Sequence, residues 1–284
     1  KDRDHVFNHY GTLMFCSISG YVIEGRREVI MMKKSVLVAG CGKSGVQAAN
    51  LLLENNEAVI LYDGNREIDR ESLKGQLCGE AEIILGELEE ELTHRISYCV
   101  ISPGISLEVP FVRLLQEKGI QIRSEIQLAY TYEQGQVIGI TGTNGKTTTT
   151  TLVGDIMKAF LGEDRCFTVG NIGTPYAKEV MKTRKDSVTT IELSSFQLET
   201  ITSFRPHVAA ILNITPDHLN RHHTMECYAS VKEQITMNQT EEDFCILNYE
   251  DQRLREFGRN CPSHVIWFSG ERALEEGYYS LDGG

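Results

Sequence analysis

A glycine-rich run with one lysine and a row of threonines, ITGTNGKTTTTT, extends from Ile140 to Thr151. Apolar residues precede it at 136–140, and apolar residues at helical spacing follow at 148–161, so we expect it to join a buried strand to a helix. In such a turn glycines let backbone N–H groups point at an anion, while the helix N-terminus and Lys146 add positive charge and Thr147 offers a metal-ligating hydroxyl. The run predicts a nucleotide-phosphate site.

The spacing of this run departs from the common phosphate loop. Ile140 stands five residues before Gly145, where that pattern has glycine, so the motif is T-G-T-N-G-K-T. The alternative is a glycine-rich turn before a helix that merely tolerates threonine. Each β-branched residue weakens a first helical turn by about a few tenths of a kcal/mol relative to alanine. Selection for the fold alone would not favour this row, which supports the phosphate site.

The composition is that of an ordinary globular protein that binds small molecules. With 284 residues and 41% hydrophobic content, the chain suits two domains. A formal net charge of −12 disfavours nonspecific binding to nucleic acid or to anionic membranes, so we expect neither as a partner. Eight scattered cysteines without a C-x-x-C pair indicate reduced thiols, no structural zinc and a cytoplasmic location.

The first residues of the chain read as an appendage. No apolar run reaches the roughly 18 residues that a membrane span needs, and the stretch at 13–23 is interrupted by serines and a glycine. A cleaner start would be Met31 or Met32, because basic residues and a buried strand follow at once. Residues 1–31 are therefore predicted to form an extension of uncertain order.

A Rossmann-like domain is predicted over residues 32–132. An apolar strand at 35–39 runs into GCGKSG at 40–45, which matches G-x-G-x-x-G and precedes a helix at 46–54. A second strand at 58–62 ends at Asp63, where such folds hold a ribose. Further strands are expected at 83–85, 98–101 and 120–122, with a crossover helix at 109–117. A lone G-x-G-x-x-G motif reports phosphate, so a nicotinamide-dependent oxidoreductase stays an alternative.

A second α/β domain, of the P-loop type that binds ATP, is predicted over residues 133–284. Its later strands are expected at 188–192, 208–213 and 244–247. In open α/β sheets ligands bind outside the carboxyl ends of the strands, so Glu192, Asn213 and the phosphate loop should converge there. Two phosphate-binding loops favour a transferase or ligase, while a noncatalytic nucleotide-binding module remains a second alternative.

Four segments together resemble the Mur ligases. They are TGTNGKT at 141–147, GNIG at 170–173, ELSSFQLE at 192–199 and LNITPDHLNRH at 212–222. The third is similar to the branch of this family that adds D-glutamate, as is SPGI at 102–105. Folylpolyglutamate synthases share the TGTNGK loop but have no comparable ELSSFQLE segment. The resemblance covers the chain from about Lys33 onward.

The resemblance implies an ATP-dependent amide-forming reaction in peptidoglycan precursor synthesis. ATP would phosphorylate the terminal carboxylate of UDP-N-acetylmuramoyl-L-alanine, and the amine of D-glutamate would attack the acyl phosphate. Mg²⁺ at two sites would neutralise the phosphates. Members of the family carry a third, C-terminal domain that completes the ATP site. This sequence is expected to lack that domain, to contain an incomplete central domain and to catalyse little ligation alone.

The resemblance also implies roles for individual residues. The residues expected to act in catalysis are Lys146, His218 and Lys232. Those expected at ATP are Gly142, Thr143, Asn144, Gly145, Lys146, Thr147, Thr148 and Asn213. Those expected at the UDP substrate are Ser44, Asp63, Ser102, Gly104, Asn171, Ser194 and Gln197. The expected metal ligands are Thr147, Glu192, His218 and Lys232.

Lys232 has two interpretations. Tyr228, Val231 and Ile235 are apolar at helical spacing around it, and burial disfavours an ammonium. The residues alone favour a lysine that extends its charge to solvent, whereas the resemblance implies that a neutral amine is carbamylated and serves the second metal. His218, His222 and His223 could be read as a zinc cluster, but no cysteine or carboxylate partner lies at close spacing, so zinc is disfavoured.

Overall fold

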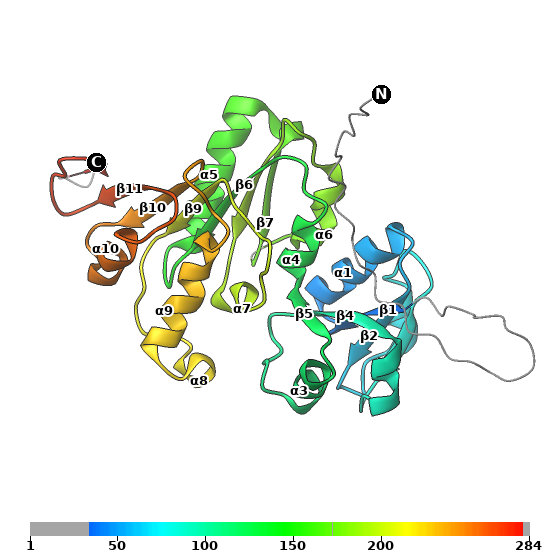
Figure 1. Ribbon diagram of the computed structural model, residues 1–284. Coiled ribbons are helices and arrows are strands. Elements are labelled where there is room, and N and C mark those ends of the chain that lie inside the picture. Colours follow the sequence, from blue (N-terminus) through cyan, green and yellow to red (C-terminus); the bar gives the residue numbers. More distant parts are fainter. Residues whose placement is uncertain (1–33, 172, 281–284) are drawn as a thin grey trace, which may run out of the picture.

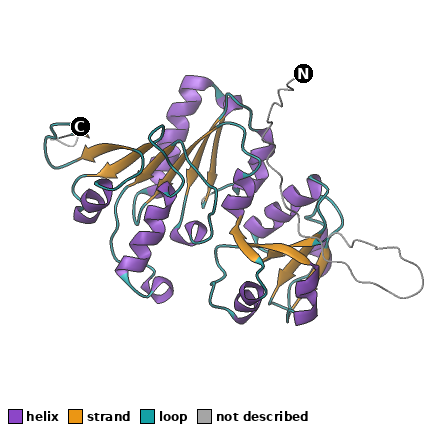
Figure 2. Cartoon of the chain, in the orientation of Figure 1, coloured by secondary structure: helices purple, strands orange, loops and turns teal. Residues whose placement is uncertain are grey.

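The computed structural model describes residues 34–171 and 173–280. The expected extension over residues 1–31, and the proposed start at Met31 or Met32, lie outside the described residues. Two parallel sheets form the described part, and helices cover their faces (Figures 1 and 2). The α/β fold expected from the sequence, a Rossmann-like sheet followed by a P-loop-type sheet, is confirmed.

The first sheet has the strand order β3-β2-β1-β4-β5, which is the order of the first five strands of the Rossmann fold. Both faces of its central strand are buried, because Val36 and Val38 enter one core and Leu37 and Ala39 enter another. This explains why the strand reads as a continuous apolar run. The strands are β1 (Ser35–Ala39), β2 (Val59–Asp63), β3 (Glu82–Leu85), β4 (Ile96–Ile101) and β5 (Gln121–Ser124).

The second sheet has the order β12-β11-β10-β9-β6-β8-β7, and every pairing in it is parallel. The strand order reverses at β6, which lies between β8 and β9. The strands are β6 (Gln136–Thr141), β7 (Cys166–Gly170), β8 (Val188–Glu192), β9 (Val208–Ile211), β10 (Phe244–Asn248), β11 (His264–Ser269) and β12 (Tyr278–Tyr279).

Local sequence explains where several helices begin. Asp69, Ser124, Ser194, Thr224 and Asp251 each accept backbone hydrogen bonds at a helix start. The helices are α1 (Lys43–Glu54), α2 (Arg70–Lys74), α3 (Pro110–Glu117), α4 (Glu125–Tyr130), α5 (Lys146–Leu161), α6 (Tyr176–Glu179), α7 (Ser195–Leu198), α8 (Leu219–His222), α9 (Met225–Glu233) and α10 (Gln252–Gly258). Short 3₁₀ turns lie at Glu90–Arg95, Glu163–Arg165, Val180–Lys182 and Gln234–Thr236.

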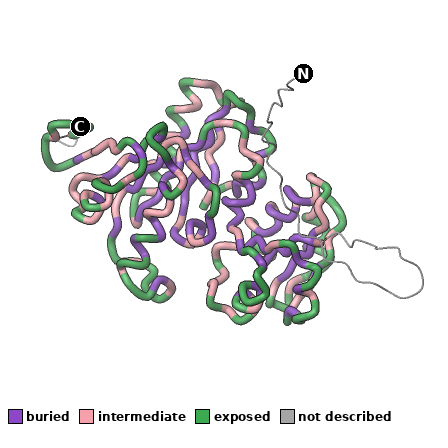
Figure 3. The backbone as a smooth tube through the Cα atoms, in the orientation of Figure 1, coloured by how far each residue is buried: buried purple, intermediate pink, exposed green. Residues whose placement is uncertain are grey.

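The two sheets are joined through α1, α4 and α6, which pack on one another between them (Figure 1). Although α4 follows the last strand of the first sheet, its polar side chains bind the second half of the chain. Gln127 Oε1 accepts from the backbone N–H groups of Thr202, Ser203 and Phe204. The core runs through this contact, and buried segments continue from strands into the linking helices (Figure 3).

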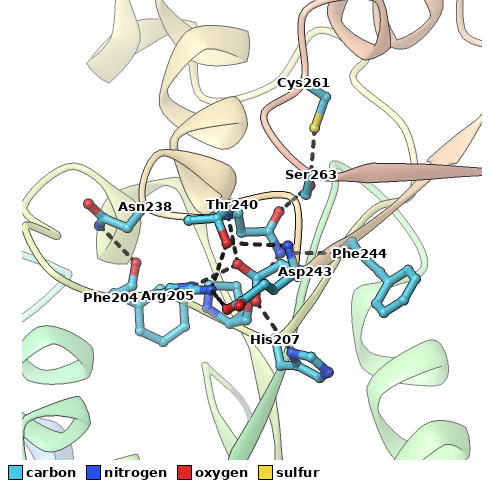
Figure 4. Close-up of polar contacts among 12 residues, drawn as sticks. Phe204, Arg205, His207, Asn238, Thr240, Asp243, Phe244, Cys261 and Ser263 are labelled. Atoms are coloured by element: carbon cyan, nitrogen blue, oxygen red, sulfur yellow. Dashed lines mark hydrogen bonds and ion pairs between the residues drawn. The ribbon is translucent and has the colours of Figure 1, made fainter.

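The amino-terminal edge of the second sheet is closed by a polar network (Figure 4). Asp243, which is 3% exposed, accepts from Arg205 Nε at 2.7 Å and from the Thr240 backbone at 2.8 Å. Burial acts to raise the pKa of Asp243, but its hydrogen bonds, from Arg205 above all, outweigh burial and lower it. This network connects the segment that precedes β9 to the segment that precedes β10. It lies at the amino ends of the strands, whereas the phosphate loop lies at their carboxyl ends.

The structure departs from the expected elements in two respects. Strands β7 and β12 carry no long apolar run and were not expected. Strand β11 was also not expected, although its residues 265–268 form an apolar run. In α5, Leu152, Ile156 and Phe160 are 59%, 56% and 81% exposed, while Thr150 and Gly154 are buried. The apolar spacing therefore predicts the helix but does not identify its buried face.

The seven cysteines in the described part of the chain are free thiols, and Cys16 lies outside that part. In that same part we find no helix that combines the length and the apolar character required to cross a membrane.

Candidate functional site

The phosphate loop lies between β6 and α5, where the strand order of the second sheet reverses. Gly142 and Gly145 have φ of 151° and 82°, in the left-handed region that favours glycine. The 16-residue helix α5 begins at Lys146, so its free N–H groups and dipole face the loop. A switch point with a helix N-terminus is a site at which an anionic ligand is stabilised.

Asn213, which follows β9, holds the phosphate loop in place. Its Oδ1 accepts from the Asn144 backbone at 2.9 Å, and its Nδ2 donates to the Asn144 carbonyl at 3.1 Å. The Asn213 carbonyl accepts from Thr143 N at 2.9 Å. The structure thus brings Asn213 to the loop as expected, and the contacts identify it as a support for loop conformation. Its contact with a nucleotide stays a prediction.

Glu192, at the end of β8, is a buried carboxylate with neutral partners. It is 1% exposed, and its oxygens accept from Thr147 Oγ1 at 2.9 Å and from Asn171 Nδ2 at 3.0 Å. Over residues 34–171 and 173–280, no lysine, arginine or histidine forms an ion pair with it. A buried carboxylate requires a compensating charge. The carboxylate and the Thr147 hydroxyl fit a hard divalent cation such as Mg²⁺.

Two lysines converge on the same carbonyl of the loop. Lys146 Nζ donates to the carbonyls of Gly142 and Thr143, at 3.0 and 2.8 Å, and Lys232 Nζ donates to Gly142 at 2.8 Å. Lys232 is 1% exposed and lies 4.7 Å above the Tyr228 ring. Burial, assisted by the charge of Lys146, lowers the pKa of Lys232 to about 7. The structure therefore excludes the solvent-facing lysine that the residues alone favoured.

His218 precedes α8 and has a left-handed backbone, with φ of 51°. Its ring packs 4.9 Å from that of Phe196, and its Nε2 lies 3.4 Å from Asp217 Oδ2. No hydrogen bond or ion pair in the described ranges joins His218 to Glu192 or Lys232. No three His, Cys, Asp or Glu residues gather there as a potential metal site. The second metal site stays a prediction.

The residues expected at the UDP substrate in the first domain lie at the carboxyl ends of β1, β2 and β4. Asp63 Oδ2 accepts from Cys41 N at 2.8 Å and so anchors the first glycine loop. Gly40 has φ of 101°, and a Cβ there would lie 2.5 Å from Ser102 Oγ. This Oγ is buried and has no partner among the described atoms. Ser44 lies in the first turn of α1, and a Cβ on Gly104 would meet open space.

Ser194 and Gln197 form a capping box at the start of α7. Gln197 Oε1 accepts from Ser194 N and Oγ, both at 2.9 Å, and Ser194 Oγ accepts from Gln197 N at 3.3 Å. These bonds give both side chains a structural role. Asn171 is exposed beside Glu192. Contacts of these three residues with a substrate stay predictions.

The sequence analysis missed a cluster that joins α7 to α8. His222 Nε2 lies 2.9 Å from Ser195 Oγ and its Nδ1 lies 3.6 Å from Glu199 Oε1. Burial lowers the pKa of His222, although Glu199 acts in the opposite direction. Ser195 and His222 are each 2% exposed, so this hydrolase-like arrangement is closed to substrate and serves as a structural tie. The motifs at 192–199 and 212–222 contain all three residues, but no feature of the sequence indicates that the two motifs contact each other here.

Two parallel α/β sheets, each with a glycine-rich loop at a strand-order switch, place the protein in the class of doubly wound α/β proteins. Two family models match the chain: "Mur ligase MurD-like, N-terminal domain" over residues 34–124 and "Mur ligase middle domain" over residues 140–279. The chain belongs to the Mur ligase family.

Curated relatives and solved structures are similar to this chain over most of its length. It is 51% identical to the UDP-N-acetylmuramoylalanine--D-glutamate ligase of Lachnospira eligens, with 89% of this chain and 56% of the relative covered. The enzyme of the same name from Lachnoclostridium phytofermentans is 52% identical, with 87% and 54% covered. The chain thus spans about half the length of these relatives.

The solved structures show the fold alone. A UDP-N-acetylmuramate:L-alanyl-gamma-D-glutamyl-meso-diaminopimelate ligase from Neisseria meningitidis has a TM-score of 0.55 and 17% identity, with 86% of this chain and 82% of that chain covered. A murein peptide ligase from Psychrobacter arcticus has a TM-score of 0.55 and 16% identity, with 85% and 56% covered.

Proposed function

We propose that this chain carries the UDP-substrate-binding and ATP-binding halves of a cytoplasmic ligase. The ligase would join D-glutamate to UDP-N-acetylmuramoyl-L-alanine in peptidoglycan precursor synthesis. The observation that carries the proposal is the buried Glu192 carboxylate at the end of β8, which accepts hydrogen bonds from Asn171 and from Thr147 at the start of α5. The printed names of the relatives support the choice of substrates.

The reaction proposed for this site has two steps. The alanine carboxylate attacks the γ-phosphorus of ATP and releases ADP, and the D-glutamate amine then displaces phosphate from the acyl phosphate. Loop amides and Lys146 hold the phosphates in line, since positioning and charge neutralisation provide most of the catalysis in phosphoryl transfer. Thr147 and Glu192 would hold a Mg²⁺ ion, which would supply positive charge to neutralise the phosphates.

We propose that Lys232 is carbamylated and serves, with His218, a second Mg²⁺ site. Its Nζ lies against the Gly142 carbonyl and is closed off from solvent. A lysine whose pKa is lowered to about 7 is half neutral at that pH and largely neutral above it. A neutral amine attacks CO₂ and loses a proton, which replaces a cation by a carboxylate-like group that binds metal.

The experiment that tests the proposed function is calorimetry on this chain. We expect UDP-N-acetylmuramoyl-L-alanine to bind more tightly than UDP-N-acetylglucosamine and NAD to show no binding. Preferred binding of NAD at Gly40–Gly45 would instead support a nicotinamide-dependent oxidoreductase and overturn the proposal. Nucleotide binding without any binding of the UDP substrate would favour a noncatalytic module.

Substitution of Lys146 tests the phosphate site separately. Lys146→Gln removes a charge-assisted contact worth about 1.5–3 kcal/mol, so we expect the dissociation constant for Mg·ATP to rise about 10- to 100-fold. Lys158→Gln is the matched control, because Lys158 lies on the same helix in a loose 3.9 Å ion pair with Asp155. Equal effects of both substitutions on ATP binding would contradict the assignment of Lys146.

A further inference from the structure

The side chain of Arg221 joins three segments that are distant in sequence. Its Nη1 donates to the Pro103 carbonyl at 2.9 Å, in the loop that follows β4 of the first sheet. Its Nε and Nη2 donate to the two oxygens of Glu199 at 3.1 and 2.5 Å. Its guanidinium lies 4.2 Å from the centre of the Phe196 ring. One planar group thus links the first domain to α7 and α8.

Each of the three segments holds residues expected at the ligands. Pro103 lies between Ser102 and Gly104, which are expected at the UDP substrate. Phe196 and Glu199 follow Glu192 and Ser194 in the same short stretch. The Phe196 ring contacts both Arg221 and His218, and its centroid lies 4.9 Å from that of the histidine. Movement of the guanidinium would therefore affect residues expected at the UDP substrate and residues expected at the metal.

The contacts of Arg221 are largely shielded from solvent. The side chains of Arg221 and Glu199 are only 13% and 11% exposed, so their two-pronged pair is shielded from solvent and more directional than a surface pair. A second contact between the halves, His223 Nε2 to Glu108 Oε1 at 3.1 Å, has side chains 62% and 57% exposed. An exposed pair of that kind contributes little.

We infer that Arg221 is a positioning residue that couples binding of the UDP substrate to binding of Mg·ATP. The inference rests on the proposed function. The guanidinium fixes the loop around Pro103 relative to the segment from Glu192 to Glu199, so a ligand that orders one side prepares the other. A lysine keeps the charge but cannot bind both Glu199 oxygens and Pro103 at once.

The test combines binding and hydrogen exchange on this chain. In the unsubstituted protein we expect saturating Mg·ATP to tighten UDP-N-acetylmuramoyl-L-alanine binding at least about fivefold, a typical coupling. Arg221→Lys should reduce that factor to about 1 and leave Mg·ATP binding alone within about twofold. Glu199→Gln should act in the same way, because it frees the guanidinium. His223→Gln is the matched control and should retain the full factor.

Hydrogen exchange provides a readout that needs no ligand. Arg221→Lys should speed exchange of amides at 102–107 and leave those of β1 and β2 unchanged. Coupling that persists in both Arg221→Lys and Glu199→Gln would overturn the inference, as would affinities that fall together with global stability. An unsubstituted chain that bound neither ligand would overturn the proposed function and the coupling, while unchanged exchange at 102–107 would overturn the mechanical tie itself.

Discussion

At the scale of single residues, the site is defined by charges placed where solvent cannot stabilise them. Glu192 is 1% exposed with neutral partners, and Lys232 is 1% exposed against a backbone carbonyl. Such groups cost folding free energy unless a ligand, a metal or a chemical modification compensates them. Their presence beside a phosphate loop is the reason for assigning chemistry to this edge of the sheet.

Carbamylation of Lys232 can be tested at this same scale. We expect ¹³C NMR of the chain equilibrated with ¹³C-bicarbonate to show a lysine carbamate resonance, because burial favours the neutral amine that reacts with CO₂. Lys232→Arg should abolish the resonance, and Lys158→Arg, on the exposed side of α5, should retain it. A resonance that persists in Lys232→Arg would assign the carbamate to another lysine.

At the scale of elements, helix starts and strand ends set the two ligand loops. In the first domain Gly45, in the first turn of α1, packs against the preceding loop, where an added Cβ would lie 1.8 Å from the Gly40 carbonyl oxygen. Gly40 in turn allows Ser102 to approach from the end of β4. Packing of the helix and of Ser102 on the loop therefore requires glycine at positions 40 and 45, whichever nucleotide binds there.

Gly45→Ala should consequently destabilise the protein. The new Cβ must push α1 away from the Gly40 carbonyl, and overpacking of this kind costs about 1–3 kcal/mol in free energy of unfolding, measured by urea titration. Gly42→Ala is the matched control in the same loop, since a Cβ added at Gly42 would have no neighbouring atom within 4 Å, and it should cost no more than about 1 kcal/mol. Equal losses would disprove the packing argument.

At the scale of the whole molecule, the two halves meet through buried polar groups. Glu125, the first residue of α4, is 2% exposed and accepts from Ala177 N of α6 at 2.6 Å. Tyr176 donates its hydroxyl to Glu133 at 2.7 Å beside this contact. Burial raises the pKa of Glu125 to about 7, against the effect of hydrogen bonds from the Ala177 and Tyr176 backbone. The interface therefore contains a carboxyl group that stays protonated to a higher pH than an ordinary glutamate does.

Stability should depend on pH through Glu125. Because its folded pKa is about 7 against an ordinary value of 4.5, the folded state binds more protons between these values. The contribution is fully present below pH 4.5 and is lost as pH rises through 7. Glu125→Gln imitates the protonated group, so its free energy of unfolding relative to the unsubstituted chain should rise by up to about 3 kcal/mol from pH 4.5 to 8. An equal difference at both pH values would refute this.

Local patterns in the sequence were sufficient for the central strands and for the phosphate loop. Strands 35–39 and 188–192 agree with the structure because short runs of apolar and β-branched residues, bounded by glycine or an acidic residue, leave few alternatives. The expected convergence of Glu192, Asn213 and the loop also agrees, since parallel strands end at one edge. Strand β11 was missed although its residues 265–268 are apolar, because a short apolar run does not by itself distinguish a strand from a buried helix segment.

What the sequence by itself determined is the two glycine loops with the strand before and the helix after each of them, because those depend on neighbours in the chain. Tertiary structure alone decided that α5 buries Thr150 and Gly154, that α4 serves the second half, and that Arg221 reaches Pro103. The last two residues lie 118 positions apart. Contacts of that kind arise from how the two sheets pack, and the spacing of residues along the chain does not predict that packing.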